Sequence, residues 1–188
     1  EATLALAVRA VLARRKGPVV TNLSTSRMIE DLALAAGVPF ARTAVGEAHV
    51  VTGMRAAGAV IGGEGNGGVI APEAHLGRDG TVAAVLVTQA WADAGGDFAA
   101  AVRSLPRYVM MKHKVEGVRD WPARAEELRT LFTEYALDTT DGLRFARERA
   151  WLHVRPSGTE PIVRLIAESP DAAATQDLLA RARRVFAA

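Results

Sequence analysis

The stretch WLHVRPSGTEPIVRLIAES, residues 151–169, places a polar loop between two apolar segments. The flanking segments, residues 151–154 and 162–167, are short, mostly apolar and partly β-branched, which predicts two strands buried largely on both faces. The loop between them, RPSGTEP, brings an arginine, two hydroxyl side chains and a glycine together with two prolines. So many hydrogen-bond donors between buried strands indicate a binding site for an anion.

Two interpretations of the RPSGTEP loop are open from its residues. In the first the loop binds phosphate: Arg155 would supply a guanidinium fork that matches phosphate oxygens. Ser157 and Thr159 would add hydroxyl groups, and Gly158 an amide that no side chain shields. The prolines would stiffen the loop, so that less conformational freedom is lost on binding. In the second interpretation the loop is only a strand-to-strand turn, because Pro-Ser-Gly is common turn chemistry.

The composition sets limits on the class of protein. The chain has 188 residues, 49% of them hydrophobic, which is enough for one large domain or two small ones. Lys and Arg number 23 against 21 Asp and Glu, and aromatic residues do not interleave with basic runs, so nucleic acid is not a favoured partner. The absence of Cys excludes disulfide bonds and thiolate metal sites. No metal site is expected from the histidines, which show no ligand spacing: His49, His75, His113 and His153.

Targeting signals are not apparent in the sequence. No apolar run approaches the roughly 20 residues of a membrane span. The first residues also lack the hydrophobic core and cleavage pattern of a signal peptide. We therefore expect a cytoplasmic protein with no membrane partner.

The N-terminal part of the chain alternates predicted helices and strands. Their apolar periodicity and their Gly, Pro, Ser and Thr boundaries follow the usual start and stop signals. This alternation predicts an α/β domain with a parallel or mixed sheet. Helices are predicted over residues 1–17, 24–39, 48–58 and 81–95, and strands over residues 18–22 and 59–63.

The C-terminal part follows a different order, in which strands are grouped and helices lie at either end of the group. This order predicts a smaller α+β domain. We place the boundary near Leu105, giving domains 1–104 and 105–188. Asp120 is the expected cap of one helix, and Ser169 and Pro170 the expected cap and first residue of the last. Strands are predicted near residues 104–117, 142–147, 151–154 and 162–168, and a helix over residues 120–135.

A second polar loop, GGEGNGG at residues 62–68, also has several interpretations. Three of its glycines match the dinucleotide pattern G-x-G-x-x-G, which requires a helix to begin at the third glycine. A plain flexible turn is the second interpretation, because glycines supply positive φ angles. The third is a sugar site, in which Glu64 and Asn66 offer acceptors and donors to hydroxyl groups. Gly67 and the other glycines would let the backbone come close.

Together the two loops resemble those of the α-D-phosphohexomutases, the family of phosphoglucomutases, phosphomannomutases and phosphoglucosamine mutases. RPSGTEP is similar to the phosphate-binding loop of that family's fourth domain, and GGEGNGG to the sugar-binding loop of its third. TAVGEAHVV at residues 43–51 and RDGTVAAVLV at residues 78–87 agree as well. The resemblance extends over essentially the whole chain. It implies an α/β third domain followed by a fourth domain with a TATA-binding-protein-like fold.

The resemblance also implies roles for individual residues. Glu64 would bind sugar hydroxyls, with Asn66 and Gly67 beside it where the family often has Ser-Gly. Glu47 lies in a segment that often contacts substrate and is a further candidate. Gly68 stands where many members have a histidine, so the role of that histidine is not carried over. The phosphate group that is not transferred would be held by Arg155, Ser157, Gly158 and Thr159.

Members of the family transfer a phosphoryl group from a phosphoserine, with Mg²⁺ held by an aspartate-rich loop, through a bisphosphorylated sugar. Neither the serine loop nor the aspartate-rich loop occurs in this sequence, so no catalytic residue and no metal ligand is expected in this chain. A start within a helix, without methionine, suggests a truncated or processed fragment. The isolated chain is expected to be inactive. Its partners would be a phosphorylated hexose and the missing N-terminal domains of the same protein.

Three functions therefore compete. The first is the substrate-binding C-terminal half of a phosphohexomutase, whose parent protein requires Mg²⁺. The second is a stand-alone module that binds sugar phosphates without catalysis. The third is a nucleotide-dependent enzyme built on the G-x-G-x-x-G match. The preferred hexose phosphate stays open among the glucosamine, mannose and glucose compounds.

Overall fold

The computed structural model describes residues 1–118, 120–158 and 160–187 of the chain. The chain divides into two compact units, Glu1–Arg107 and Tyr108–Ala188. The first is an α/β unit with a mixed sheet, and the second combines an antiparallel sheet with helices, so the predicted fold class is confirmed.

The sheet of the first unit has four strands in the order β2-β1-β3-β4. Strand β1 pairs in parallel with both β2 and β3. Strands β3 and β4 pair antiparallel, which makes the sheet mixed. The strand bounds are Val19–Asn22 for β1, Phe40–Thr43 for β2, Ile61–Glu64 for β3 and Gly68–Ile70 for β4.

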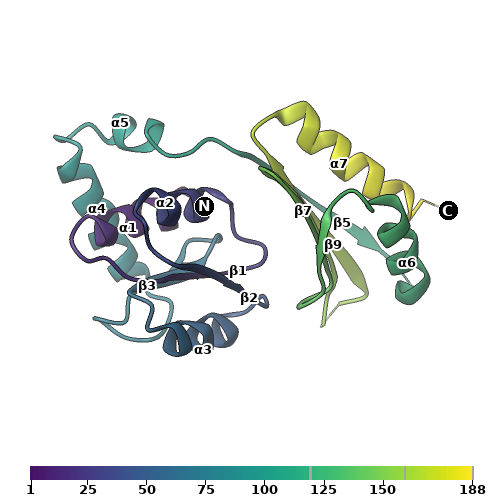
Figure 1. Cartoon of the computed structure of the whole chain (residues 1–188), viewed down its shortest axis with the longest axis horizontal. Coiled ribbons are helices and arrows are strands. Elements are labelled where there is room, and N and C mark those ends of the chain that lie inside the picture. Colours follow the sequence, from purple (N-terminus) through teal and green to yellow (C-terminus); the bar gives the residue numbers. More distant parts are fainter. Residues whose placement is uncertain (119, 159, 188) are drawn as a thin grey trace. The chain divides into compact units, whose positions relative to one another are not determined.

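Helices cover both faces of this sheet (Figure 1). One hydrophobic cluster joins the sheet to helices α1, α2, α4 and α5, and a second joins it to α3 on the opposite face. Helix α1 lies at the centre of the first cluster, with seven of its 11 residues buried. The helix bounds are Ala2–Leu12 for α1, Met28–Ala35 for α2, Glu47–Ala57 for α3, Gly80–Asp93 for α4 and Phe98–Arg103 for α5.

Three elements of the first unit were not predicted. Strands β2 and β4 and helix α5 lie outside the ranges in which the sequence predicts a strand or a helix. Helix α1 also ends at Leu12, earlier than Gly17, because the Arg14 and Arg15 amides bond to the Val11 carbonyl in a closing turn. Strands of three or four residues carry too little periodicity to be recognised alone. They become strands because neighbouring strands pair with them.

The second unit is a five-stranded antiparallel sheet in the order β5-β9-β8-β7-β6. Helices α6 and α7 cover one face, since residues of both share a hydrophobic cluster with Leu152, Val154 and Leu165 (Figure 1). The strand bounds are Val109–Glu116 for β5, Ala136–Asp138 for β6, Leu143–Arg147 for β7, Ala150–Pro156 for β8 and Ile162–Ser169 for β9. The helix bounds are Trp121–Leu131 for α6 and Ala172–Arg184 for α7.

The helix caps of the second unit only partly follow the prediction. Asp120 caps α6 as expected, accepting a hydrogen bond from the Ala123 amide at 3.2 Å. The predicted cap of α7 is wrong, because Asp171 rather than Ser169 accepts from the first turn, at 2.8 Å from the Ala174 amide. Ser169 is instead the last residue of β9, and its hydroxyl bonds the Thr175 hydroxyl at 2.8 Å.

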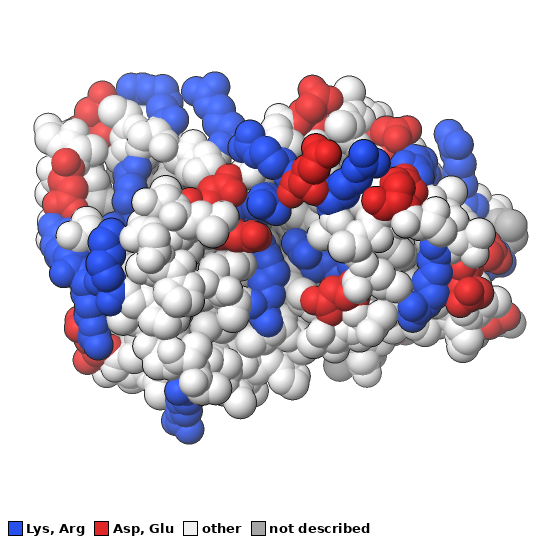
Figure 2. Space-filling model, viewed as in Figure 1, with Lys and Arg blue, Asp and Glu red and all other residues white. Residues whose placement is uncertain are grey.

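Charge is distributed without a single dominant sign. On the face drawn in Figure 2, basic and acidic side chains are interspersed between uncharged areas, in keeping with a formal net charge of +2. Within the described residues, none of the helices has both the length and the apolar character needed to cross a membrane.

Candidate functional site

The GGEGNGG segment forms a tight hairpin between β3 and β4. Glu64 is the last residue of β3 and Gly68 the first of β4, and the Gly67 amide donates to the Glu64 carbonyl oxygen at 3.2 Å. Gly67 has a φ of +96°, which favours glycine. A side chain at Gly63, where φ is +146°, would place its Cβ 2.1 Å from the Gly68 carbonyl oxygen. Because a strand and not a helix begins at the third glycine, the dinucleotide interpretation of the motif is wrong.

Glu64 is a buried carboxylate with partners on several sides. Only 6% of the surface of Glu64 is exposed to solvent. Oε1 accepts from the Asn22 side-chain amide at 2.7 Å and from the Gly46 backbone amide at 3.1 Å. Oε2 lies 3.3 Å from Nη1 of Arg78. A buried charge is tolerated when it is paired and hydrogen-bonded in this way, and these contacts fix the orientation of the carboxylate.

Asn22 links this carboxylate to the end of β1. Its Oδ1 accepts from the Ser24 amide and from the Thr25 hydroxyl, both at 2.9 Å. The Thr25 hydroxyl oxygen in turn accepts from the Gly65 amide at 3.0 Å. The end of β1 and the β3–β4 hairpin are therefore tied into one hydrogen-bonded network. Because β1 and β3 pair in parallel, their carboxyl ends, and the chain segments that follow them, lie at the same end of the strands.

Arg78 and Glu47 form the outer part of the same site. Arg78 donates to Glu47 twice, through Nε at 2.7 Å and through its backbone amide at 3.0 Å. These two hydrogen bonds hold the pKa of Glu47 below its usual value. Beside this pair lies a hollow of about 390 Å³, named here the Arg78 hollow. It is lined by Glu47, Asn66, Gly67, Gly68, Arg78, Asp79 and Gly80.

The sugar-site residues expected from the sequence thus take two different positions. Glu47, Asn66 and Gly67 line the Arg78 hollow, whereas Glu64 lies behind the guanidinium that contacts it. Arg78 and Asn22 were not predicted as site residues. Arg78 lies in the segment RDGTVAAVLV, which entered only through the family resemblance, and nothing local to it points back to residues 47 and 64.

The RPSGTEP segment forms the hairpin between β8 and β9. Arg155 lies opposite Arg164 in the register, and the Ser157 amide donates to the Ile162 carbonyl oxygen at 2.8 Å. A Cβ at Gly158 would meet open space. Thr159, the fourth residue implied for phosphate binding, lies outside the described residues. The loop is therefore a strand-to-strand turn in geometry, which leaves its binding role as a separate question.

Arg155 is held from the side by the turn between β6 and β7. Its Nε donates to Oδ1 of Asp141 at 3.2 Å, and its side chain is 24% exposed. The Asp141 carbonyl oxygen accepts from Nε2 of the buried His153 at 2.6 Å. Burial lowers the pKa of His153, which keeps this imidazole neutral near pH 7. One residue of the turn thus contacts two alternate residues of β8, on the same face of the strand.

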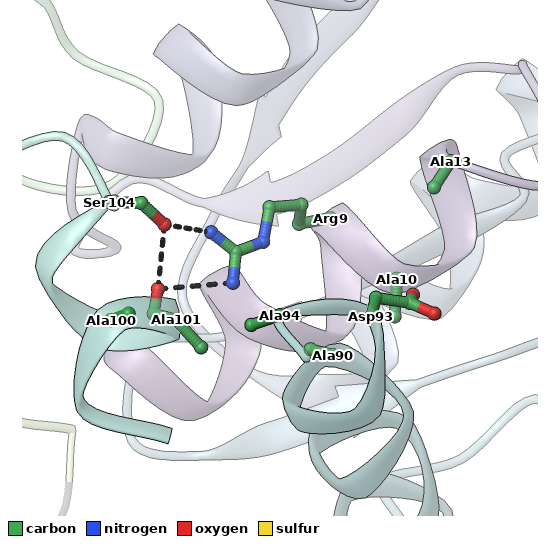
Figure 3. Close-up of a pocket in the computed structure, with 9 residues that line it drawn as sticks. All are labelled: Arg9, Ala10, Ala13, Ala90, Asp93, Ala94, Ala100, Ala101 and Ser104. Atoms are coloured by element: carbon green, nitrogen blue, oxygen red, sulfur yellow. Dashed lines mark hydrogen bonds between the residues drawn. The ribbon is translucent and has the colours of Figure 1, made fainter. Parts of the chain in front are cut away.

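A second hollow in the first unit, between α1, α4 and α5, is lined mainly by small apolar side chains. The volume of this hollow is about 460 Å³. Figure 3 shows that alanines make up most of its lining and that Arg9 reaches Ser104 and the Ala101 carbonyl oxygen. These contacts join α1 to α5, and Asp93, the other charged side chain drawn there, pairs with Arg14 at 2.7 Å. In residues 1–118, 120–158 and 160–187, no group of three or more His, Asp or Glu side chains is placed to hold a metal ion.

Comparison with known proteins agrees with these two units. Residues 1–108 match the family model of the phosphoglucomutase/phosphomannomutase alpha/beta/alpha domain III, and residues 110–185 match that of the phosphoglucomutase/phosphomannomutase C-terminal domain. A phosphoglucomutase/phosphomannomutase of Thermococcus kodakarensis is 36% identical over 170 residues, covering 89% of this chain and 37% of the relative. A phosphoglucosamine mutase of Methylibium petroleiphilum is 34% identical, covering 84% of this chain and 33% of the relative.

Solved structures show the same fold. A phosphoglucomutase/phosphomannomutase family protein from Burkholderia thailandensis superposes with a TM-score of 0.82 at 23% identity, covering 98% of this chain and 40% of that one. An Aspergillus fumigatus N-acetylphosphoglucosamine mutase, solved in complex with GlcNAc-6P and magnesium, gives a TM-score of 0.68 at 17% identity. It covers 98% of this chain and 46% of that one.

The fold is thus that of domain III and the C-terminal domain of the phosphoglucomutase/phosphomannomutase proteins. The chain belongs to the phosphoglucomutase/phosphomannomutase family, the α-D-phosphohexomutases, and corresponds to its C-terminal half. It spans less than two fifths of the length of the two curated relatives described above.

Proposed function

We propose that this chain is the substrate-binding C-terminal half of a phosphohexomutase, which interconverts hexose 1-phosphate and hexose 6-phosphate. In this proposal the β8–β9 hairpin holds the phosphate group that is not transferred. The region around the β3–β4 hairpin binds the sugar hydroxyls. The observation that carries the proposal is the side-on contact between Asp141 and Arg155 on a hairpin of a mutase C-terminal domain.

The β8–β9 hairpin has the chemistry that a phosphate group requires. The contact with Asp141 uses Nε of Arg155, so it does not occupy the two terminal nitrogens that form the guanidinium fork. A fork matches two oxygens of one phosphate, and charge-assisted hydrogen bonds of this kind are strong. Ser157 would add its hydroxyl, and Gly158 an amide with open space beside it. We extend the same role to Thr159 on its sequence position alone.

The β3–β4 region has the chemistry that a neutral sugar requires. Glu64 offers a carboxylate fixed by Asn22 and Gly46, and Asn66 and Gly67 line the Arg78 hollow. Hydroxyl groups both donate and accept, so a carboxylate beside amide groups can recognise them in a defined orientation. Glu47 would act through Arg78, whose backbone and side chain it holds.

The reaction itself would depend on groups outside this chain. In the proposed parent protein a phosphoserine gives its phosphoryl group to one sugar oxygen, and the serine recovers the other phosphoryl group after the bisphosphorylated sugar has turned around. Mg²⁺ bound outside this chain would neutralise charge on the phosphoryl oxygens. The residues of this chain would hold the sugar phosphate in both orientations. Binding energy from such remote contacts orients the reacting groups and lowers the barrier.

An amide-resolved NMR titration of this chain tests the proposal. The ligands are inorganic phosphate, glucose 1-phosphate and glucosamine 6-phosphate. We expect all three to shift the amides of Arg155, Ser157 and Gly158, and only the two sugars to shift amides at residues 64–67 as well. Arg155→Ala should abolish the phosphate response, whereas Arg147→Ala should keep it, because Arg147 is 56% exposed, is paired with Glu148, and ends β7 opposite Ala150, the first residue of β8. Lack of any response at residues 155–158 in the unaltered chain would contradict the assignment.

Kinetics of the full-length parent protein provide the second test. Arg155→Ala should weaken substrate use by about 2–4 kcal/mol in kcat/KM, the loss expected for a charge-assisted contact to substrate. Unchanged kinetics in this variant would rule out the proposed role of Arg155.

A further inference from the structure

Arg78 is the cationic side chain among the residues that line the Arg78 hollow. Its side chain is 42% exposed, against 7% for the side chain of Glu64. The guanidinium is nevertheless fixed in place, because Nε bonds Glu47 at 2.7 Å and Nη1 lies 3.3 Å from Glu64. A side chain that is both exposed and immobilised at a hollow is suited to contacting a ligand, since little conformational freedom is lost on binding.

The charges around Arg78 indicate what kind of atom it would bind. Two carboxylates flank the one guanidinium, so its positive charge is already compensated. A doubly charged phosphate in this hollow would meet the repulsion of Glu47 and Glu64 at close range. A neutral oxygen, such as a sugar hydroxyl, can accept a hydrogen bond from the guanidinium without that repulsion.

Gly68 provides the space that Arg78 occupies. A Cβ at this position would lie 2.3 Å from Cδ and 3.0 Å from Cγ of Arg78, so any side chain at position 68 would push the arginine stem away. Gly68 is not among the positive-φ glycines of the chain, so the backbone does not by itself demand glycine here. The close approach of Arg78 is the physical reason for a glycine at this position.

We propose that Arg78 is a sugar-binding residue whose guanidinium donates a hydrogen bond to a hydroxyl oxygen of the bound hexose, and that Gly68 makes this placement possible. This inference rests on the proposed function, since it adds a contact to the same sugar site. Glu64 and Arg78 together would present an acceptor and a donor to the sugar. Arg78 supplies the donor, and Glu47 fixes the position of Arg78.

The test compares substrates that differ by one hydroxyl group in the full-length protein that contains this chain. Glucose 1-phosphate and its 3-deoxy and 4-deoxy analogues are used with the unaltered protein and with Arg78→Ala. We expect Arg78→Ala to lower kcat/KM for glucose 1-phosphate about 10- to 150-fold, as for a lost hydrogen bond to a charged group. For one of the two deoxy analogues the loss should be about twofold or less, because that analogue never makes the bond. An equal loss for all three substrates would mean that Arg78 is only structural, and would overturn the inference.

Two further variants sharpen this test. Arg78→Lys should recover only part of the activity, since an ammonium lacks the fork that bonds Glu47 and Glu64 while reaching the sugar. Arg14→Ala is the matched control, because Arg14 pairs with Asp93 at 2.7 Å and is 49% exposed, away from the hollow. It should leave kcat/KM unchanged.

A double-mutant cycle tests the link between Gly68 and Arg78. Gly68→Ala should lower kcat/KM at least tenfold in the unaltered background, and have little effect once Arg78 is alanine, because the steric conflict is then gone. Equal effects in the two backgrounds would overturn the proposed role of Gly68. Thermal unfolding of each variant checks that the fold is kept.

The two proposals fail in different ways. If the unaltered full-length protein converts none of the hexose phosphates tested, the proposed function is wrong. If it converts them and Arg78→Ala retains the full preference for both hydroxyl groups, only the inference on Arg78 is wrong.

Discussion

Oδ1 of Asp141 lies 3.2 Å from Nε of Arg155, so a residue of the β6–β7 turn fixes an arginine at the end of β8. The same turn residue accepts from His153 through its carbonyl oxygen. If Arg155 binds phosphate, Asp141 is a positioning residue that orients the guanidinium before the ligand arrives. Preorganisation of this kind raises affinity by reducing the ordering cost of binding.

Asp141→Ala should therefore weaken phosphate binding to the chain by about 1–2 kcal/mol, a loss on the scale of a hydrogen bond to a charged group. The dissociation constant for inorganic phosphate, measured by NMR titration, checks this. Glu134→Ala is the control, because it removes a carboxylate paired with Arg181 at 3.0 Å in the same unit. An unchanged dissociation constant in Asp141→Ala would show that Arg155 does not depend on this contact.

Gly142 is expected to be sensitive to substitution by alanine. Its φ is +73°, and a Cβ there would lie 2.5 Å from the Val154 carbonyl oxygen and 2.8 Å from Cβ of Arg155. Gly142→Ala should lower the free energy of unfolding of the second unit by at least about 2 kcal/mol, since backbone strain and steric overlap add. Urea unfolding followed by amide signals of residues 143–156 measures this.

Gly117→Ala separates the two causes. Gly117 has a φ of +70° but nothing within 4 Å of a Cβ, so this variant carries the backbone strain alone, about 1 kcal/mol. A loss in Gly142→Ala no larger than that in Gly117→Ala would mean that the turn yields to the added methyl group.

Buried His153 makes stability dependent on pH. Its pKa is lowered in the folded state, chiefly by burial. Nearby Asp141 opposes this effect and raises the pKa, whereas the positive charges of Arg144 and Arg155 lower it further. Below pH 6.5, the ordinary value, the unfolded chain binds a proton that the folded chain binds less readily. This stability contribution is therefore present above pH 6.5 and is lost as pH falls below it.

His153→Gln should remove that dependence, because glutamine does not titrate. The melting temperature of the unaltered chain should fall more between pH 7 and pH 5 than that of His153→Gln. His113, whose pKa is also lowered by burial, is present in both proteins and cancels in the difference. Parallel melting curves across this range would contradict the assignment.

The cap of α7 offers a test of helix stability. Asp171→Ala should cost about 1 kcal/mol, because the Ala174 amide loses its acceptor. Asp177→Ala, within the same helix, should be neutral or slightly stabilising, since alanine has the higher helix propensity. Equal effects of the two substitutions, measured by urea unfolding, would remove Asp171 from the role of cap.

The features that could be predicted from the sequence were those that depend on short local patterns of residues. Apolar, partly β-branched segments on either side of RPSGTEP predicted β8 and β9, and the Asp120 cap followed from local chemistry. The cap of α7 did not, because Ser169 and Asp171 are both good caps and the choice depends on where β9 ends. Strand pairing decides that end, and pairing is not a local property.

The candidate site shows the same division between local and non-local features. Glu64, Asn66 and Arg155 stand within recognisable loops. Arg78 lies 31 residues from Glu47 in the chain, and Asp141 lies 14 residues from Arg155. Their contacts exist only because the sheets bring separate turns together. Local sequence patterns therefore identified the two candidate loops and Glu47, but not Arg78 and Asp141, which contact them from other turns.

Strand β5 affects how readily copies of the chain can associate through their sheets. It forms one edge of the antiparallel sheet and is eight residues long, the kind of exposed edge on which another chain can add a strand. Its alternate residues Lys112, Lys114 and Glu116 are exposed charges. A second β5 added in parallel register would place Lys112, Lys114 and Glu116 opposite the same residues of the other copy, and such like-charge pairs are destabilising. The alternating charges of β5 thus oppose parallel pairing of two copies through this edge.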